Sequence, residues 1–254
     1  MRSVLTADKT GRNRKSDKSE GNGRAAVNSV RRWRPQNGSI WAMAQINAKN
    51  REIQLKIVYY GPGRGGKTTS LEHIQQTLAE RAGKEMVKLK GNENRTLFFD
   101  FYPLKVGTVK GYSVRVQLYT VPGQNRLQPL RRLVLKGVDS IVFVADAMDM
   151  QRKHNIASFQ NLLENLAHHG QKLSNLPFIV QLNKVDLAEE DIPVITLPTL
   201  KADLAACLNE DHFIENVPFF ETSAASGKNI LRTLEAIIKK TVKQLDFDAI
   251  AQKS

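Results

Sequence analysis

Cysteine is nearly absent from this 254-residue chain, and long apolar runs are missing altogether. The single cysteine, Cys207, cannot form an internal disulfide, which favours a reducing, cytoplasmic environment. No stretch of 18 apolar residues occurs, so we expect neither a membrane-spanning helix nor a secretory signal. No zinc-type spacing of cysteine and histidine is present either. The apolar fraction of 41% is sufficient for one good hydrophobic core.

The positive charge is distributed unevenly. Residues 1–42 carry ten Lys and Arg against three Asp and Glu, a balance of +7 out of a net charge of +13. This segment mixes Gly, Ser, Asn and Arg without a period and has few aliphatic residues, so we expect a disordered basic leader. Met43 offers an alternative start, which would make residues 1–42 an over-long reading of the gene. We therefore assign the folded domain to residues 43–254.

A glycine-rich segment carries the most specific chemical signal. Residues 61–68, with the sequence GPGRGGKT, match the phosphate-binding pattern G-x-x-x-x-G-K-[ST]. Glycines let backbone N–H groups turn inward around an anion, and a helix beginning near Gly66 adds its positive end. Lys67 is expected to reach the outer phosphates, and Thr68 to offer a hydroxyl to Mg²⁺. The nucleotide-binding residues expected here are Gly61, Gly63, Arg64, Gly65, Gly66, Lys67, Thr68 and Thr69.

The apolar pattern predicts an alternation of strands and helices around this segment. Residues 53–60 alternate apolar and more polar side chains, as a strand does, and residues 70–81 carry apolar side chains at helical spacing. Further strands are expected over 95–104, 112–120, 140–146, 178–182 and 217–222, and helices over 127–136, 157–169, 200–208 and 229–245. Only residues 107–111 separate two of these strands, which predicts an antiparallel hairpin. The fold class is therefore a three-layer α/β domain with a mostly parallel sheet and one antiparallel edge hairpin.

A second motif indicates which base is bound. Asn183, Lys184 and Asp186 directly follow the buried strand 178–182, at the edge of the sheet where ligands bind in open α/β folds. A carboxylate at Asp186 can accept two N–H bonds from guanine, and adenine lacks this pair of donors. Lys184 would lay its stem over the base or clasp the loop. The expected ligand is therefore GTP or GDP.

Two further motifs complete a family resemblance. Residues 120–124 (TVPGQ) lie between the first two motifs, and residues 221–225 (ETSAA) follow them. Together the four resemble the nucleotide-binding motifs of the Ras-like small GTPases. Near-verbatim stretches resemble a bacterial branch of that family, the MglA-type GTPases of gliding motility and cell polarity; they are residues 56–63, 95–101, 118–124 and 135–139. The resemblance implies a P-loop domain that uses Mg²⁺ and slowly hydrolyses GTP to GDP.

The resemblance also implies roles for single residues. Thr96 would bind Mg²⁺ together with Thr68, and Gly123 would give its backbone N–H to the γ-phosphate. Gln124 would orient the attacking water, and Arg95 is a candidate arginine finger. The base would be approached from its far side by Ser223 and Ala224, and Ala225 stands where other Ras-like proteins have lysine.

The sequence departs from the Ras-like pattern at one position of the metal site. Thr120 occupies the place of an aspartate that holds Mg²⁺ through water, as it does in MglA-type proteins. One hypothesis is that Asp100 partly substitutes for this aspartate; the alternative is a carboxylate on the solvent side of its strand. A second hypothesis, suggested by the family, is that strand 95–104 slides against its neighbour on GTP binding. A slip of two residues would preserve the face of each side chain.

Partners follow from the resemblance alone. It implies a Roadblock-type, MglB-like GTPase-activating protein, polar scaffold and motility effectors that bind the GTP form, and recruitment to the cell poles through them. No prenylation or myristoylation motif is present, so we expect no direct lipid anchor. One alternative is an RNA- or ribosome-associated GTPase tethered by the basic leader, whose RNA binding would depend strongly on salt. Another is a module that binds nucleotide without hydrolysing it.

Overall fold

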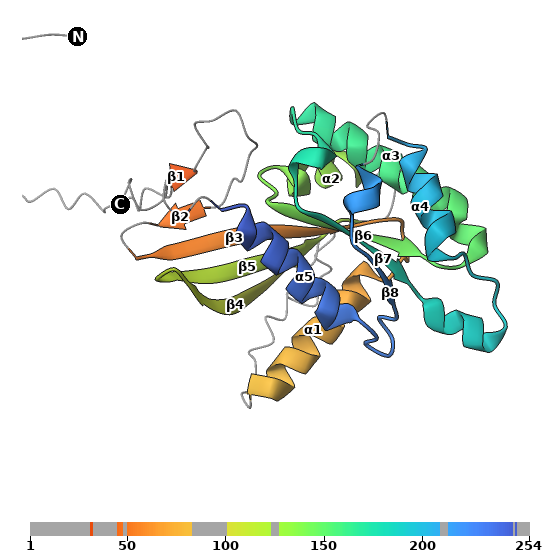
Figure 1. The fold of residues 1–254 in the computed structure, drawn as a ribbon, viewed down its shortest axis with the longest axis horizontal. Helices are drawn as coiled ribbons and strands as arrows, with labels where there is room; N and C mark the ends of the chain where they lie inside the picture. Colours follow the sequence, from red (N-terminus) through yellow and green to blue (C-terminus); the bar gives the residue numbers. More distant parts are fainter. Residues whose placement is uncertain are drawn as a thin grey trace, which may run out of the picture.

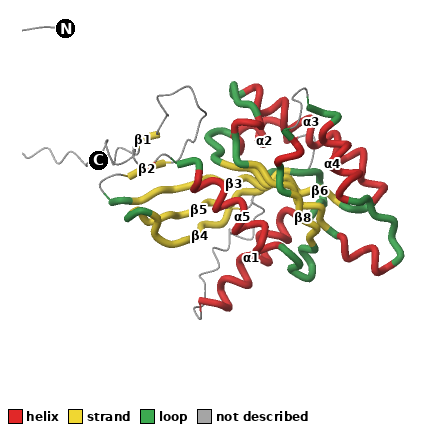
Figure 2. Tube along the Cα trace, in the orientation of Figure 1, coloured by secondary structure: helices red, strands yellow, loops and turns green. Residues whose placement is uncertain are grey.

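A mixed, mostly parallel sheet runs through the molecule, with helices on both of its faces (Figures 1 and 2). The computed structural model describes residues 31–32, 45–47, 50–82, 101–122, 127–208, 213–245 and 247. Within these residues the sheet has eight strands: β1 (Arg31–Arg32), β2 (Gln45–Asn47), β3 (Glu52–Tyr60), β4 (Phe101–Val109), β5 (Tyr112–Thr120), β6 (Ser140–Asp146), β7 (Phe178–Asn183) and β8 (Phe219–Thr222). The α-helices of this part of the chain are α1 (Lys67–Ala82), α2 (Gln128–Leu135), α3 (Arg152–His168), α4 (Leu197–Ala205) and α5 (Ile230–Lys243).

Strand β3 organises the sheet. One of its edges pairs in parallel with β5 over residues 52–59. The other edge is shared, because β2 pairs antiparallel with residues 52–54 and β6 pairs in parallel with residues 57–60. Strands β7 and β8 continue in parallel beyond β6, and β4 is the antiparallel partner of β5. This arrangement confirms the predicted class, and it brings the carboxyl ends of β3, β6 and β7 to one edge, where open α/β folds bind ligands.

Alternation along β3 divides the hydrophobic core into two layers. Val58 and Tyr60 point to the face covered by α2, α3 and α4. The side chains buried toward α1 and α5 are Ile53, Leu55, Ile57 and Tyr59. Because successive side chains of a strand point to opposite faces, one short segment anchors helices on both sides of the sheet.

The structure corrects several predicted boundaries. Strand β4 continues through Gly107 to Val109, with a bulge between Lys105 and Gly107, so the hairpin turn is shorter than the predicted 107–111. Helix α3 begins five residues before the predicted 157, because its polar first turn carries no apolar periodicity. Helix α4 begins at Leu197 and ends at Ala205; the Thr196 hydroxyl caps its start by accepting from the Thr199 N–H at 3.4 Å.

Two short strands are not predicted by the sequence. Strands β1 and β2 are two and three residues long, too short to leave an alternating pattern, and they extend the sheet beside the first half of β3. Of the predicted basic leader, only Arg31 and Arg32 are described, and both pair with β2. Disorder over residues 1–42 stays a prediction, and so does the strand over residues 95–100, which lie outside the described part of the chain.

Asp139 fixes the point at which β6 joins β3. Its backbone N–H donates to the Lys56 carbonyl at 2.9 Å, and one of its carboxylate oxygens accepts from the Lys56 N–H at 2.6 Å. Asp139 is 3% exposed, so these bonds form inside the protein. They extend the ladder just before its first pair, between Ile57 and Ser140.

We predict that Asp139→Ala lowers the free energy of unfolding by about 1–3 kcal/mol, because it removes this acceptor from the partly buried Lys56 N–H. Asp139→Asn retains a side-chain oxygen that can accept the bond and should lose clearly less. Urea unfolding followed by circular dichroism measures both variants. Equal losses in the two variants would show that the accepted bond is not the source of the effect.

Candidate nucleotide-binding site

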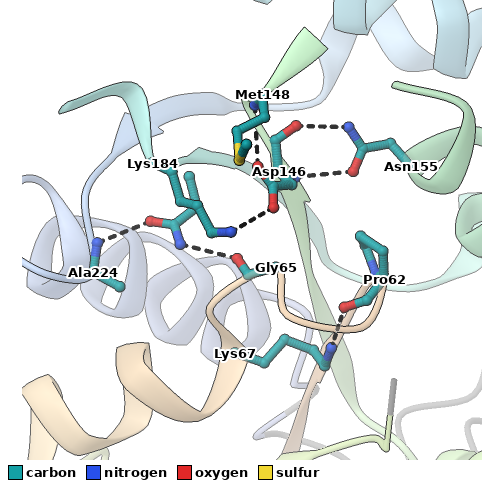
Figure 3. Close-up of polar contacts among 9 residues, drawn as sticks. Pro62, Gly65, Lys67, Asp146, Met148, Asn155, Lys184 and Ala224 are labelled. Carbon is teal, nitrogen blue, oxygen red and sulfur yellow. Dashed lines mark hydrogen bonds and ion pairs between the residues drawn. The ribbon is translucent and has the colours of Figure 1, made fainter. Parts of the chain in front are cut away.

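The loop that joins β3 to α1 folds around the ammonium group of Lys67. Lys67 Nζ donates to the carbonyl oxygens of Pro62 at 2.6 Å and Gly61 at 3.1 Å, and the residue is 6% exposed (Figure 3). Glycine is required at position 61, because a Cβ there would lie 2.1 Å from the carbonyl oxygen of Val144 in β6. The lysine is thus held at the loop, from which a phosphate-loop lysine reaches the outer phosphates of a nucleotide.

Helix α1 presents its amino-terminal end to the same loop. The helix starts at Lys67, no acidic residue lies in its first turn, and the Ser70 N–H donates to the Gly66 carbonyl at 2.9 Å. Thr68 and Thr69 are exposed in this turn, and Gly63 and Arg64 are exposed on the loop. A helix start free of acidic side chains keeps its partial positive charge available for an anionic ligand.

Asn183, the last residue of β7, links three loops. Its Nδ2 donates to the Gly65 carbonyl at 2.9 Å, and its Oδ1 accepts from the Ala224 N–H at 2.9 Å and from the Thr222 hydroxyl at 3.2 Å. The side chain is 1% exposed. The structure therefore brings the phosphate loop, the 183–186 motif and the 221–225 motif together, as the sequence predicts.

Lys184 is held by a carboxylate from the neighbouring strand. Its Nζ lies 2.6 Å from Asp146 Oδ2, and Asp146 Oδ1 accepts from the Met148 N–H at 3.0 Å (Figure 3). The Asn155 side chain binds both backbone groups of Asp146, accepting from its N–H at 2.9 Å and donating to its carbonyl at 2.8 Å. Asp146 and Asn155 are 2% and 1% exposed, so this anchor is buried.

The sequence does not identify Asp146 and Asn155 as parts of the site. A signal was available for Asp146, because it is the last residue of an apolar strand that runs parallel to β7, and it pairs in register with Asn183. Asn155 lies in the polar first turn of α3, which has no pattern that marks it.

Asp186 has the property expected of a base-reading carboxylate. It lies in the short 3-10 segment Val185–Glu190 that follows β7. Its Oδ1 is buried and has no hydrogen-bond partner among the described residues. A buried acceptor without a partner is costly, and a ligand that supplies N–H donors removes that cost.

The 223–225 segment forms a compact loop beside Asn183. The Ser223 Oγ accepts from the Ser226 N–H at 3.1 Å, so this side chain turns into its own loop. Ala224 is buried, and Ala225 is exposed. Ser223 thus shapes the loop, while the backbone of Ala224 ties it to the strand end.

The remaining predicted residues lie outside the described part of the chain. These are Arg95, Thr96, Asp100, Gly123 and Gln124. Their predicted roles in catalysis, in metal binding and at the γ-phosphate therefore stay predictions, as does the strand slip. Within the described residues, no cluster of three or more His, Cys, Asp or Glu could hold a metal ion. Thr68 suits Mg²⁺ nonetheless, because this ion takes few protein ligands and completes its shell with phosphates and water.

The fold and the loop geometry define the class of P-loop nucleotide-binding proteins. The sequence model of the ADP-ribosylation factor family matches residues 41–241. The chain therefore belongs to this family of Ras-like small GTPases. It is accordingly an enzyme that binds GTP and hydrolyses it to GDP.

Among individual proteins, the chain is similar to the mutual gliding-motility protein MglA of Myxococcus xanthus (strain DK1622). The two are 41% identical over 204 residues, which cover 80% of this chain and 98% of that protein. The chain is also 26% identical to the Ras-related protein RABG3c of Arabidopsis thaliana and 25% identical to the Ypt/Rab-type GTPase Rab7 of Neurospora crassa, over 77% and 78% of this chain and 86% of each relative. No helix in the described ranges is long and apolar enough to cross a membrane.

We predict that Gly66→Ala weakens GDP binding by about tenfold or more, because the new methyl group displaces a buried hydrogen-bonded amide. A Cβ at this position would lie 2.1 Å from Asn183 Nδ2, and the backbone φ of +93° is unfavourable for alanine. Displacement of Asn183 would release both the phosphate loop and the Ala224 loop. Competition against a fluorescent GDP analogue measures the affinity.

Gly170→Ala is the matched control. Gly170 also has a positive φ, +66°, but nothing lies within 4 Å of its added Cβ. We expect this variant to lose some stability and to keep its GDP affinity. A comparable loss of affinity in both variants would contradict the role given to Asn183.

Proposed function

We propose that this GTPase is a nucleotide-dependent switch whose GTP-bound form binds partners that control gliding motility and cell polarity. The support is its 41% identity to a protein named for gliding motility, over 98% of that protein's length. The observation that carries the nucleotide part of the proposal is the buried Oδ1 of Asp186, which has no hydrogen-bond partner within the described part of the chain. Asp186 lies three residues after Asn183, which binds the phosphate loop.

Guanine would supply what the base end of this site needs. Its N1–H and its exocyclic amino group donate side by side, and the Asp186 carboxylate accepts both. Adenine presents an acceptor at N1 and would leave the carboxylate unpaired, which strongly disfavours it. Lys184, fixed by Asp146 at 2.6 Å, would flank the base with its aliphatic stem. We infer that the phosphate end of the nucleotide lies on the loop and on the start of α1.

We assign hydrolysis to residues that position the γ-phosphate and the attacking water. Lys67 would bind the outer phosphates, and Thr68 and Thr96 would hold Mg²⁺, which neutralises charge on the phosphate oxygens. Gln124 would orient the water, and Arg95 would stabilise charge that develops on the transferred group. Gly123 would give its backbone N–H to the γ-phosphate. Each role combines the family pattern with the chemistry of the side chain.

We further propose that a Roadblock-type, MglB-like protein accelerates hydrolysis. Polar scaffold and motility proteins would bind the GTP form and recruit it to the cell poles. These partners follow from the similarity to MglA rather than from a surface of this chain.

The first test concerns the base. We predict that Asp186→Asn weakens GTP binding on the order of 100-fold, because two charge-assisted hydrogen bonds are lost. The same variant should gain affinity for xanthosine triphosphate, since an asparagine N–H can donate to the carbonyl that xanthine carries in place of the amino group. Isothermal titration with both nucleotides gives the change.

Asp191→Asn is the control for this substitution. Asp191 is an exposed acid five residues after Asp186, directly after the 3-10 segment Val185–Glu190, so its substitution should leave both affinities unchanged. An Asp186→Asn protein with unaltered GTP affinity would refute the assignment of the base pocket.

The second test concerns the switch. We predict slow single-turnover GTP hydrolysis by the chain alone and a rise of at least about tenfold with a Roadblock partner, which improves positioning and charge stabilisation. Gln124→Leu should abolish the stimulated rate while nucleotide affinity is retained. A stimulated rate that survives this substitution would remove Gln124 from the mechanism.

A further inference from the structure

A histidine of α1 touches the loop that leads into α5, the helix beside it on the same face of the sheet (Figure 1). The edge of the His73 imidazole occupies the place of a side chain at Gly227: its Cε1 and Nε2 would each lie 2.1 Å from a Cβ there. A carbon–carbon bond is about 1.5 Å long, so the ring is in van der Waals contact with the Gly227 backbone. His73 is partly buried and belongs to none of the nucleotide motifs.

Thr77, one turn further along α1, orients this ring. Its hydroxyl donates to the His73 carbonyl oxygen at 2.9 Å, and a carbonyl can only accept. Because the single hydroxyl proton is used there, the 3.3 Å contact between Thr77 Oγ1 and His73 Nε2 is donated by the ring. The imidazole is therefore held by its own helix while its Cε1–Nε2 edge meets Gly227.

Gly227 closes the loop that it belongs to. Its N–H donates to the Ser223 carbonyl at 2.8 Å, and the Ser223 N–H donates to the Lys228 carbonyl at 3.2 Å. The backbone φ of Gly227 is +81°, a conformation that favours glycine. Since these two bonds tie the ends of residues 223–228 together, a support at Gly227 also restrains the start of the loop.

The start of this loop is bound to the strand end that organises the site. The Ala224 N–H donates to Asn183 Oδ1 at 2.9 Å, and Asn183 Nδ2 donates to the Gly65 carbonyl at 2.9 Å. Helix α1 begins at Lys67, two residues after Gly65, and carries His73 on its second turn. The contacts thus form a closed circuit from α1 through the loop and Asn183 back to the phosphate loop. Loss of the His73 contact would leave the loop free to move away from Asn183.

We propose that His73 is a positioning residue that holds the 223–228 loop against Asn183 and thereby slows release of the nucleotide. The inference rests on the proposed function, with the guanine base at Asp186 and the 223–228 loop on its far side. GDP and GTP share the base, so release of both should be slowed alike.

The experiment measures release and association of a fluorescent GDP and a fluorescent non-hydrolysable GTP analogue by stopped flow, with the full chain. We expect His73→Ala to release both nucleotides about fivefold faster, with association within about twofold, because the loop opens more often. Partial unfolding would act differently. It would lower the fraction of chains that bind and leave release from the remaining chains unchanged.

His73→Gln is the conservative variant. Its amide can donate to the Thr77 hydroxyl oxygen and fills part of the place of the ring. We expect its release rates to return most of the way to those of the wild type. Release as fast as in His73→Ala would contradict the role given to this contact.

Gly227→Ala tests the other side of the contact. Its methyl group would meet the imidazole, so we expect faster release, as in His73→Ala. In the double variant the methyl group enters the space that the ring has left, so the two effects should not multiply. Gly170→Ala is the matched control, because its φ is also positive, +66°, and nothing lies within 4 Å of the added Cβ. It should release nucleotide at the wild-type rate.

Wild-type release rates in both His73→Ala and Gly227→Ala would overturn the proposal. A double variant whose rate equals the product of the two single effects would overturn it as well, because independent sites behave in this way. If Gly227→Ala does not fold, the two His73 variants decide. If the wild type binds no guanine nucleotide, the proposed function itself fails and this inference fails with it; unchanged release from a wild type and variants that do bind GDP refutes this inference alone.

Discussion

The amide of Asn183 is the interaction on which the rest of the site depends. This side chain is 1% exposed, and it donates to one loop while it accepts from another. A buried amide must satisfy both of its ends, so formation of the core around β7 commits the two loops to their positions. The bond to Gly65 joins residues 118 positions apart in the sequence. Loops without regular hydrogen bonding of their own are thereby fixed relative to the strand ends.

The ion pair of Lys184 and Asp146, next to Asn183, likewise satisfies buried polar groups. Asp146 and Asn183 occupy paired positions at the ends of β6 and β7, so their side chains emerge next to each other. A carboxylate that is 2% exposed requires compensation, and it obtains it from the Lys184 ammonium and the Met148 N–H. Lys184 has a left-handed backbone, with φ of 72°, which is unfavourable for a residue with a side chain. The ion pair helps to stabilise this turn, and the turn directs the chain toward Asp186.

The sequence was sufficient for the fold, and for the meeting of the phosphate loop with the 183–186 and 221–225 motifs, because each motif adjoins a strand that is encoded locally. The largely apolar residues 140–146 and 178–182 are buried strands in the structure, and the phosphate pattern begins directly after β3. Asn155 could not be found in this way, because its bonds to the Asp146 backbone cross from α3 to the end of β6 and leave no pattern in the sequence. The start of α3 was missed for a related reason. Its first turn is polar and contacts the rest of the protein through Asn155, which accepts from the Asp146 N–H, rather than through regularly spaced apolar side chains. Strands as short as β1 and β2 exist only through their pairing with β3 and with each other.

The structure also indicates which half of the site can report the nucleotide state. GDP and GTP carry the same base, so the base contacts proposed for Asp186 and Lys184 would contribute equally to the affinity for both and could not shift a conformational equilibrium. Only groups that sense the γ-phosphate could do so. The residues proposed for that contact, Gly123 and Gln124, lie in the sequence between β5 and α2. Leu133 on α2 is 59% exposed, an apolar side chain available to a partner on the same helix as Arg131. Arg131 ties this helix to the end of the chain that leaves β5, through its bond to the Pro122 carbonyl at 2.9 Å. A contact between α2 and a partner would therefore act close to the residues proposed for the one part of the nucleotide that hydrolysis removes.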